Sequence, residues 1–163
     1  MTTENKPYRV IVDTREKPHA IAKILAYMDT CGIEYVRAKL DVGDYMIEGK
    51  PGIVVDRKQT IDELAKNCIS DRDRFKREME RAVKNGVQLV LLVEQNRYRS
   101  LYGAVQVRGV QDLVLWHGKY TEIRGEQIYR ILAGWCQKYH LRVEFCRKSE
   151  TGKRIIEVLN DEK

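Results

Sequence analysis

The sequence predicts an α/β fold in which a central mixed β-sheet is flanked by helices within one domain. Short β-branched runs alternate along the chain with segments whose apolar residues recur every three to four positions. One run, residues 87–93, is apolar almost throughout, as expected for a strand that is covered on both faces. The chain of 163 residues can bury one such core, and it shows no internal repeat or linker.

The first part of the chain predicts a strand, a helix and a second strand. Residues 8–12 form a largely buried strand that leads into Asp13. Pro18 suits the first turn of the next helix, whose apolar residues share one face. Gly32 ends this helix. Residues 33–40 then alternate between apolar and polar side chains, which is typical of a half-buried strand.

A β-hairpin is predicted next. Its strands are residues 43–47 and 53–58, and the segment 48–52 between them is dense in glycine and proline. Together with the strand over residues 33–40, the hairpin predicts a three-strand meander.

The rest of the chain predicts five helices and two strands. Thr60 and Glu63 have the spacing of a capping box, so a helix begins there. A longer helix over residues 73–85 carries an apolar face made of Phe75, Met79, Ala82 and Val83. Residues 95–124 show little regular pattern beyond a short helix. The further elements are a strand over 87–93, that short helix over 110–116, a helix over 126–139, a strand over 141–145 and a helix over 151–159.

Composition indicates where the protein works and what it binds. No apolar run is long enough to cross a bilayer and no secretion signal begins the chain, so we expect an intracellular protein without a membrane partner. The cytoplasm of a prokaryote or of an infected host cell is favoured over the nucleus. A net charge of +6 favours a polyanionic partner. Four widely spaced cysteines predict free thiols, most of them buried, rather than a zinc site or disulfides.

Three aspartates stand at strand ends, where an unpaired buried charge is costly. Asp13 follows Val-Ile-Val, Asp44 opens a strand and Asp56 follows Ile-Val-Val. A bound divalent cation relieves the cost of such carboxylates and turns their repulsion into coordination. Asp56 and Lys58 lie two residues apart on a strand, so their side chains leave the same face. This pattern predicts phosphodiester hydrolysis, with carboxylates holding Mg²⁺ or Mn²⁺ while Lys58 orients the attacking water.

Four linked motifs extend this pattern. Residues 13–16 read D-T-R-E, residues 43–45 read G-D-Y, and residues 56–62 contain D-R-K followed by K-x-x-x-D. Together they resemble the XPF/Mus-type structure-specific endonuclease family, whose pattern runs D-x-R-E, G-D-Y and E-R-K-x-x-x-D. Residues 73–76 look like the Arg-aromatic stretch of that family. The resemblance covers residues 8–94 by motif and the rest by element order, and it implies one restriction-endonuclease-like nuclease domain over residues 1–163.

The resemblance implies roles for the matched positions. The direct metal ligands would be the carboxylates of Asp44 and Asp56 with the carbonyl of Arg57. Asp13 matches a carboxylate at the same metal cluster, and Lys58 is similar to the catalytic lysine of the family. Further positions match residues that support the catalytic site or contact the DNA backbone; these are Arg15, Glu16, Asp62 and Arg74.

Two departures from the family pattern affect these expectations. Asp56 stands where the family usually has Glu, so its carboxylate is one methylene shorter and we expect an altered metal geometry. No helix-hairpin-helix tail is recognised, which leaves selectivity for forks or flaps open. Arg97 and Arg99, interleaved with tyrosines, are either DNA contacts or ordinary surface residues.

The predicted function is a Mg²⁺- or Mn²⁺-dependent endonuclease of DNA repair or recombination, cutting branched DNA or duplex/single-strand junctions. The resemblance also implies a homodimer, because relatives pair through C-terminal elements. One alternative is a non-catalytic DNA-binding partner subunit of a nuclease. Such partners typically lose the acidic residues, whereas Asp13, Asp44, Asp56 and Lys58 are all present here. A hydrolase that processes RNA or nucleotides is a second alternative and stays open.

Overall fold

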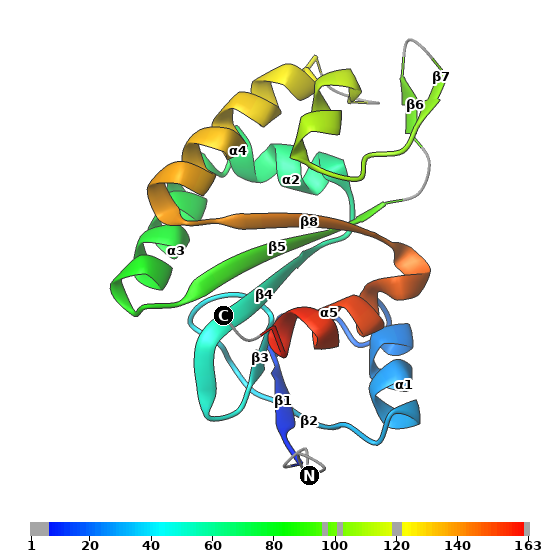
Figure 1. Cartoon of the computed structure of the whole chain (residues 1–163), viewed down its shortest axis with the longest axis vertical. Helices are drawn as coiled ribbons and strands as arrows, with labels where there is room; N and C mark the ends of the chain where they lie inside the picture. The colour runs from blue at the N-terminus through cyan, green and yellow to red at the C-terminus, as the bar shows by residue number, and fades with distance from the viewer. Residues whose placement is uncertain (1–6, 96–97, 101–102, 119–121, 162–163) are drawn as a thin grey trace, which may run out of the picture.

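The computed structural model describes residues 7–95, 98–100, 103–118 and 122–161 (Figure 1). Its main feature is a six-stranded mixed sheet with the strand order β2-β1-β3-β4-β5-β8. β1 pairs parallel with β2 and antiparallel with β3, β3 pairs antiparallel with β4, and β4, β5 and β8 run parallel. The strands are β1 (Arg9–Val12), β2 (Glu34–Arg37), β3 (Tyr45–Ile47), β4 (Lys50–Lys58), β5 (Gln88–Gln95) and β8 (Arg142–Arg147).

Helices cover both faces of the sheet (Figure 1). On one face, α1 packs against α5, and α5 also contacts β3, β4 and β8. On the other face lie α2, α3 and α4, which contact one another, while α2 and α3 also contact β5. The helices are α1 (Ala22–Thr30), α2 (Ile61–Cys68), α3 (Arg72–Lys84), α4 (Gly125–Tyr139) and α5 (Thr151–Leu159).

Strand β5 divides its side chains between the two cores. Leu89, Leu91 and Val93 belong to the cluster under α2, α3 and α4, whereas Val90 and Leu92 belong to the cluster under α1 and α5. Because successive strand residues point to opposite faces, a strand between two helix layers is apolar on both sides. This explains the continuous apolar run that predicted a doubly covered strand.

A smaller part of the chain packs outside the sheet. Strands β6 (Tyr98–Ser100) and β7 (Gly103–Val105) pair antiparallel as a separate two-stranded sheet. The 3₁₀ helix η1 (Val110–Leu115) follows, and it packs against α4 through the buried Leu113. A second 3₁₀ helix, η2 (Lys148–Glu150), joins β8 to α5.

Most predicted elements are confirmed. Thr60 caps α2 by accepting a hydrogen bond from the Glu63 amide at 3.1 Å, as the capping box predicts. Gly86 follows α3 with a φ of +68°, the left-handed conformation expected past a helix end. Helix α5 has the predicted bounds. All four cysteines are free; Cys68 and Cys146 are buried, whereas Cys136 is half-buried and Cys31 is exposed. Within the described ranges, no helix has the length and apolarity needed to span a bilayer.

Four predictions about the fold are wrong. β2 pairs with β1 rather than with β3, so residues 33–58 do not form a meander. The right-handed β1–α1–β2 crossover expected of a parallel pair places β2 beside β1 instead. β2 is also shorter than predicted, since it spans Glu34–Arg37. Pro18 lies in the turn before α1, which begins at Ala22. Val83 on α3 is 46% exposed and does not join the apolar face.

Candidate active site

The hairpin of β3 and β4 places Asp44 beside Asp56. The Asp44 amide donates to the Val55 carbonyl at 2.8 Å, which continues the antiparallel ladder past the start of β3. Gly43 precedes it with a φ of +70°, and a Cβ at this position would lie 2.2 Å from Val54 Cγ1. Glycine is therefore required for the chain to turn into β3 so closely above β4.

A small polar pocket of about 230 Å³ lies where this hairpin meets α2 and α3. It brings together Glu16, Asp44, Asp56 and Lys58 from the predicted catalytic set, and it leaves out Asp13. We refer to it as the acidic pocket. Its lining residues are Arg15, Glu16, Gly43, Asp44, Asp56, Arg57, Lys58, Glu63, Asn67, Arg74 and Glu78.

Lys58 is buried in this pocket as an ion pair with Asp56. Its ammonium lies 2.8 Å from Asp56 Oδ1, and both side chains are less than 10% exposed. The same-face placement predicted from strand spacing is thus present. Burial alone would lower the pKa of Lys58, but the charge and hydrogen bond of Asp56 raise it overall. The lysine therefore remains a cation and a hydrogen-bond donor at neutral pH.

Asp44 carries a carboxylate that its surroundings disfavour. Burial raises its pKa well above the ordinary value, and the nearby charges of Asp56 and Glu16 raise it further. One oxygen, Oδ2, accepts a hydrogen bond from the Arg57 amide at 2.9 Å. A bound cation would favour the ionised form of Asp44, because its charge would offset the burial and the repulsion that raise this pKa.

The donor set fits Mg²⁺ or Mn²⁺. Within the described residues no donor reaches Asp44 Oδ1 or Asp56 Oδ2, so each carboxylate keeps an oxygen for a ligand. Amide and carbonyl of one strand residue point to the same edge. Since the Arg57 amide points to the edge of β4 on which Asp44 lies, the Arg57 carbonyl points to that edge as well. Across the described residues no three acidic, histidine or cysteine side chains converge to hold an ion. Two carboxylates, a carbonyl and retained waters suit Mg²⁺.

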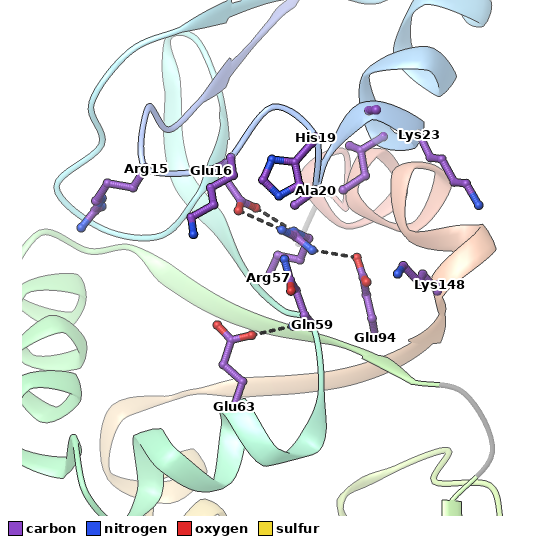
Figure 2. Close-up of a pocket in the computed structure, with 13 residues that line it drawn as sticks. Arg15, Glu16, His19, Ala20, Lys23, Arg57, Gln59, Glu63, Glu94 and Lys148 are labelled. Carbon is purple, nitrogen blue, oxygen red and sulfur yellow. Dashed lines mark hydrogen bonds and ion pairs between the residues drawn. The ribbon is translucent and has the colours of Figure 1, made fainter.

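The side chain of Arg57 is fixed in a buried charge network (Figure 2). Its Nε and Nη2 donate to the two oxygens of Glu16 at 2.7 and 2.9 Å, and its Nη1 donates to Glu94 at 3.1 Å. The hydroxyl of Tyr45 also donates to Glu16 at 3.1 Å. Through these bonds the Arg57 guanidinium links three parts of the chain: the loop after β1, which carries Glu16, strand β4 and strand β5, which carries Glu94. It thereby fixes the backbone of Arg57 beside Asp44.

Asp13 is not among the residues that line the acidic pocket. Its side chain is fully buried. Oδ1 accepts from the Leu40 amide at 2.8 Å, and Oδ2 accepts from Nε and the amide of Arg15. Both oxygens therefore already have donors in the folded chain. The role of Asp13 as a metal ligand therefore stays a prediction; in the metal-free chain both of its oxygens accept hydrogen bonds from protein donors.

Three residues that line the pocket, Glu63, Asn67 and Glu78, were not predicted as site residues from the sequence. Glu78 on α3 accepts a hydrogen bond from the Gly43 amide at 3.0 Å, and its pKa is raised by burial and then by Asp56. Asn67 on α2 is 4% exposed, and its Nδ2 has no partner within the described residues. Glu78 was hidden in a mixed-charge stretch that reads as a solvated helix face. Its spacing from Phe75, three residues along the helix, was the available signal.

The predicted DNA-contacting arginines are placed differently from one another. Arg15 and Arg74 both line the acidic pocket with exposed side chains. Asp62, which the family match also pointed to, does not line the pocket. Arg99 lies on strand β6. Arg97 lies outside the described residues.

Comparison with known proteins agrees with this geometry. The model of the ERCC4 domain family matches residues 12–159. No curated protein matches the chain. Among solved structures, XPF from Aeropyrum pernix is similar with a TM-score of 0.65 and 21% identity, over 93% of this chain. A structure of XPF from Aeropyrum pernix in complex with DNA has the same TM-score at 18% identity, also over 93% of this chain.

The matched chain of Aeropyrum pernix XPF is longer, and the alignment covers 63% of it in both structures. At these identities the structural likeness establishes the fold, a mixed sheet flanked by helices. The family match covers most of the sequence and includes all four motifs. The chain therefore belongs to the ERCC4 domain family, the XPF-type endonuclease family that its motifs resemble.

Proposed function

We propose that this protein is a Mg²⁺- or Mn²⁺-dependent DNA endonuclease that hydrolyses phosphodiester bonds at junctions between duplex and single-stranded DNA. The observation that carries the proposal is the pairing of Lys58 with Asp56 at 2.8 Å inside a pocket that also holds Asp44. A buried cation next to two carboxylates with free oxygens is the arrangement that phosphoryl transfer needs.

Asp44, Asp56 and the carbonyl of Arg57 are the groups that would hold the metal ion. When bound, the ion would polarise the scissile phosphate and offset the charge that develops on it. The Arg57 amide fixes Asp44, and the Arg57 guanidinium is fixed in turn by Glu16 and Glu94. This chain of contacts holds the carboxylate in place before substrate arrives.

Lys58 supplies a fixed positive charge and hydrogen-bond donors to the reaction. Its raised pKa means that it carries a proton, so it orients the attacking water and stabilises negative charge rather than acting as a base. Arg15 and Arg74 extend from the rim of the acidic pocket, where their guanidinium groups suit contacts to neighbouring phosphates.

Several observations support DNA as the substrate. The net charge is +6, and the matched XPF structure was obtained in complex with DNA. The retained Asp44, Asp56 and Lys58 favour an active enzyme over a non-catalytic DNA-binding partner, because such a partner has no need for a buried carboxylate pair. Branched DNA is the proposed substrate class by family membership.

The test is a cleavage assay on labelled fork, flap, duplex and single-stranded DNA, each with Mg²⁺, with Mn²⁺ or with EDTA. We expect cleavage at the fork or flap in metal and none in EDTA. Asp56→Asn and Lys58→Ala should each slow it by about 100-fold or more. Asp73→Asn, an exposed carboxylate on α3 outside the pocket, is the matched control and should cut normally. Undiminished cleavage by both site variants, or no metal-dependent cleavage of any DNA, would refute the proposal.

A further inference from the structure

A second and larger cavity adjoins the acidic pocket (Figure 2). Its volume is about 710 Å³, against about 230 Å³ for the acidic pocket. It lies between the segment from β1 into α1, the ends of β4 and β5, the start of α2, and η2. Arg15, Glu16, Arg57 and Glu63 line both cavities, so the two lie side by side and share the Arg57–Glu16 ion pair as a wall. We call the larger one the basic cavity.

The acidic groups of the basic cavity are already engaged. Glu16 and Glu94 form its floor with Arg57, and their carboxylates accept hydrogen bonds from that guanidinium (Figure 2). Glu63 accepts a hydrogen bond from the Gln59 amide at 2.8 Å. Because these carboxylates are bonded, their negative charge is partly neutralised where a ligand would enter.

Three lysines of the cavity have no such partners. Lys17, Lys23 and Lys148 are exposed, and within the part of the chain that the structure describes none of them forms an ion pair. Lys148 comes from η2, more than 120 residues after the other two, and it lines the same cavity as Lys23 and Glu94 (Figure 2). Some exposed cations are paired, such as Arg9 with Glu48 and Arg130 with Glu126, while other exposed lysines, such as Lys50, Lys84 and Lys153, form no ion pair among the described residues either. What sets Lys17, Lys23 and Lys148 apart is that all three line one cavity.

The size of the cavity selects the kind of polyanion it can take. Recesses of this volume accept ligands of nucleotide size. A rigid duplex does not enter such a recess, whereas a flexible single strand can lay its phosphates along a positively charged groove. Because the two cavities share four lining residues, a strand bound in the basic cavity would lie next to the phosphodiester bond that the proposed reaction cuts.

We propose that the basic cavity binds the phosphate backbone of the single-stranded arm of a branched DNA, through Lys17, Lys23 and Lys148. This inference rests on the proposed function and deepens it, because it assigns the recognition of a junction to this chain. A fork would then be held by two adjoining surfaces, with its scissile phosphate in the acidic pocket and its single strand in the basic cavity. A simple duplex would use only the first.

The test compares a triple variant, Lys17→Ala, Lys23→Ala and Lys148→Ala combined, with the wild-type protein. Binding to fork and to duplex is measured in EDTA, so that nothing is cut, over a range of salt concentrations. The matched control is the combination Lys50→Ala, Lys84→Ala and Lys153→Ala, which removes three exposed lysines that line neither cavity. Thermal unfolding of all three proteins checks that each is folded.

We expect the cavity variant to bind the fork about tenfold more weakly, while its duplex affinity stays within about twofold of the wild type. Loss of three single-strand phosphate contacts should make the plot of log fork affinity against log salt less steep, with a slope less negative by about 2. An unchanged fork affinity relative to the control variant, or an equal loss for fork and duplex, would overturn the inference. Failure of the wild-type protein to cut any DNA would instead count against the proposed function, independently of this comparison.

Discussion

Asp13 and the pair Asp44 and Asp56 are carboxylates of one site with opposite surroundings. Both oxygens of Asp13 accept hydrogen bonds from the protein, and the side chain is fully buried. Asp44 and Asp56 each have one such donor among the described residues, and both line the acidic pocket. A carboxylate whose oxygens are all engaged stabilises the fold, whereas one with a free oxygen is available to a ligand. We therefore expect Asp13 to contribute mainly to stability, and Asp44 and Asp56 to contribute mainly to metal binding.

The largest effect is expected from Asp56→Asn on cleavage. The amide keeps the size of the side chain but loses the negative charge that would hold the metal, so the rate should fall by roughly 100- to 1000-fold. Stability should change by only about 1 kcal/mol, because loss of the ion pair with Lys58 is offset by relief of the repulsion that Asp56 exerts on Asp44 and Glu78. Single-turnover cleavage and urea unfolding measure the two quantities. If the variant instead lost several kcal/mol of stability along with the cleavage rate, Asp56 would act mainly in folding, as we expect for Asp13.

Asp13→Ala should have the reverse profile and the next largest effect. Removing the carboxylate leaves the buried Leu40 amide without a partner and frees Arg15, so the free energy of unfolding should fall by about 2–3 kcal/mol. Mn²⁺ affinity, measured well below the unfolding temperature, should stay within about threefold of the wild type. Asp13→Asn, which keeps one acceptor for the Leu40 amide, is the control. Its free energy of unfolding should lie between those of the wild type and Asp13→Ala. A large loss of Mn²⁺ affinity with little loss of stability would restore Asp13 as a ligand.

Much of this site is readable from sequence because the motifs are local. The turn at Gly43 and the same-face pair Asp56 and Lys58 depend on contacts within one hairpin, so residue spacing predicts them. The pairing of β2 with β1 is not local; nothing in residues 33–40 distinguishes a partner at β1 from one at β3. The distinction between Asp13 and Asp44 is also invisible, since it depends on the Leu40 amide, 27 residues away.

Asp44→Asn should expose a smaller, pH-dependent effect. In the folded, metal-free protein the pKa of Asp44 is raised above its ordinary value of 3.8. The folded state therefore holds the proton more tightly than the unfolded state, and stability falls as the pH rises from about 4 through the raised pKa. The variant lacks this loss, so its free energy of unfolding should rise relative to that of the wild type between about pH 4 and about pH 8 in EDTA. Urea unfolding at both pH values checks this. A constant difference between the two proteins would mean that Asp44 does not titrate in that range.

Glu78 lies between the two kinds of carboxylate compared above. One of its oxygens accepts a hydrogen bond from the Gly43 amide, yet its side chain lines the acidic pocket. Glu78→Gln keeps an acceptor for that amide and removes the charge, whereas Glu78→Ala removes both. If the charge of Glu78 acts on the metal through a bound water, both variants should bind Mn²⁺ about tenfold more weakly. If Glu78 only positions the turn before Asp44, the Gln variant should bind like the wild type. We expect the first outcome, because Glu78 lines the acidic pocket close enough to Asp56 for that charge to raise its pKa. Glu80→Gln, on the exposed side of the same helix, should leave Mn²⁺ affinity unchanged.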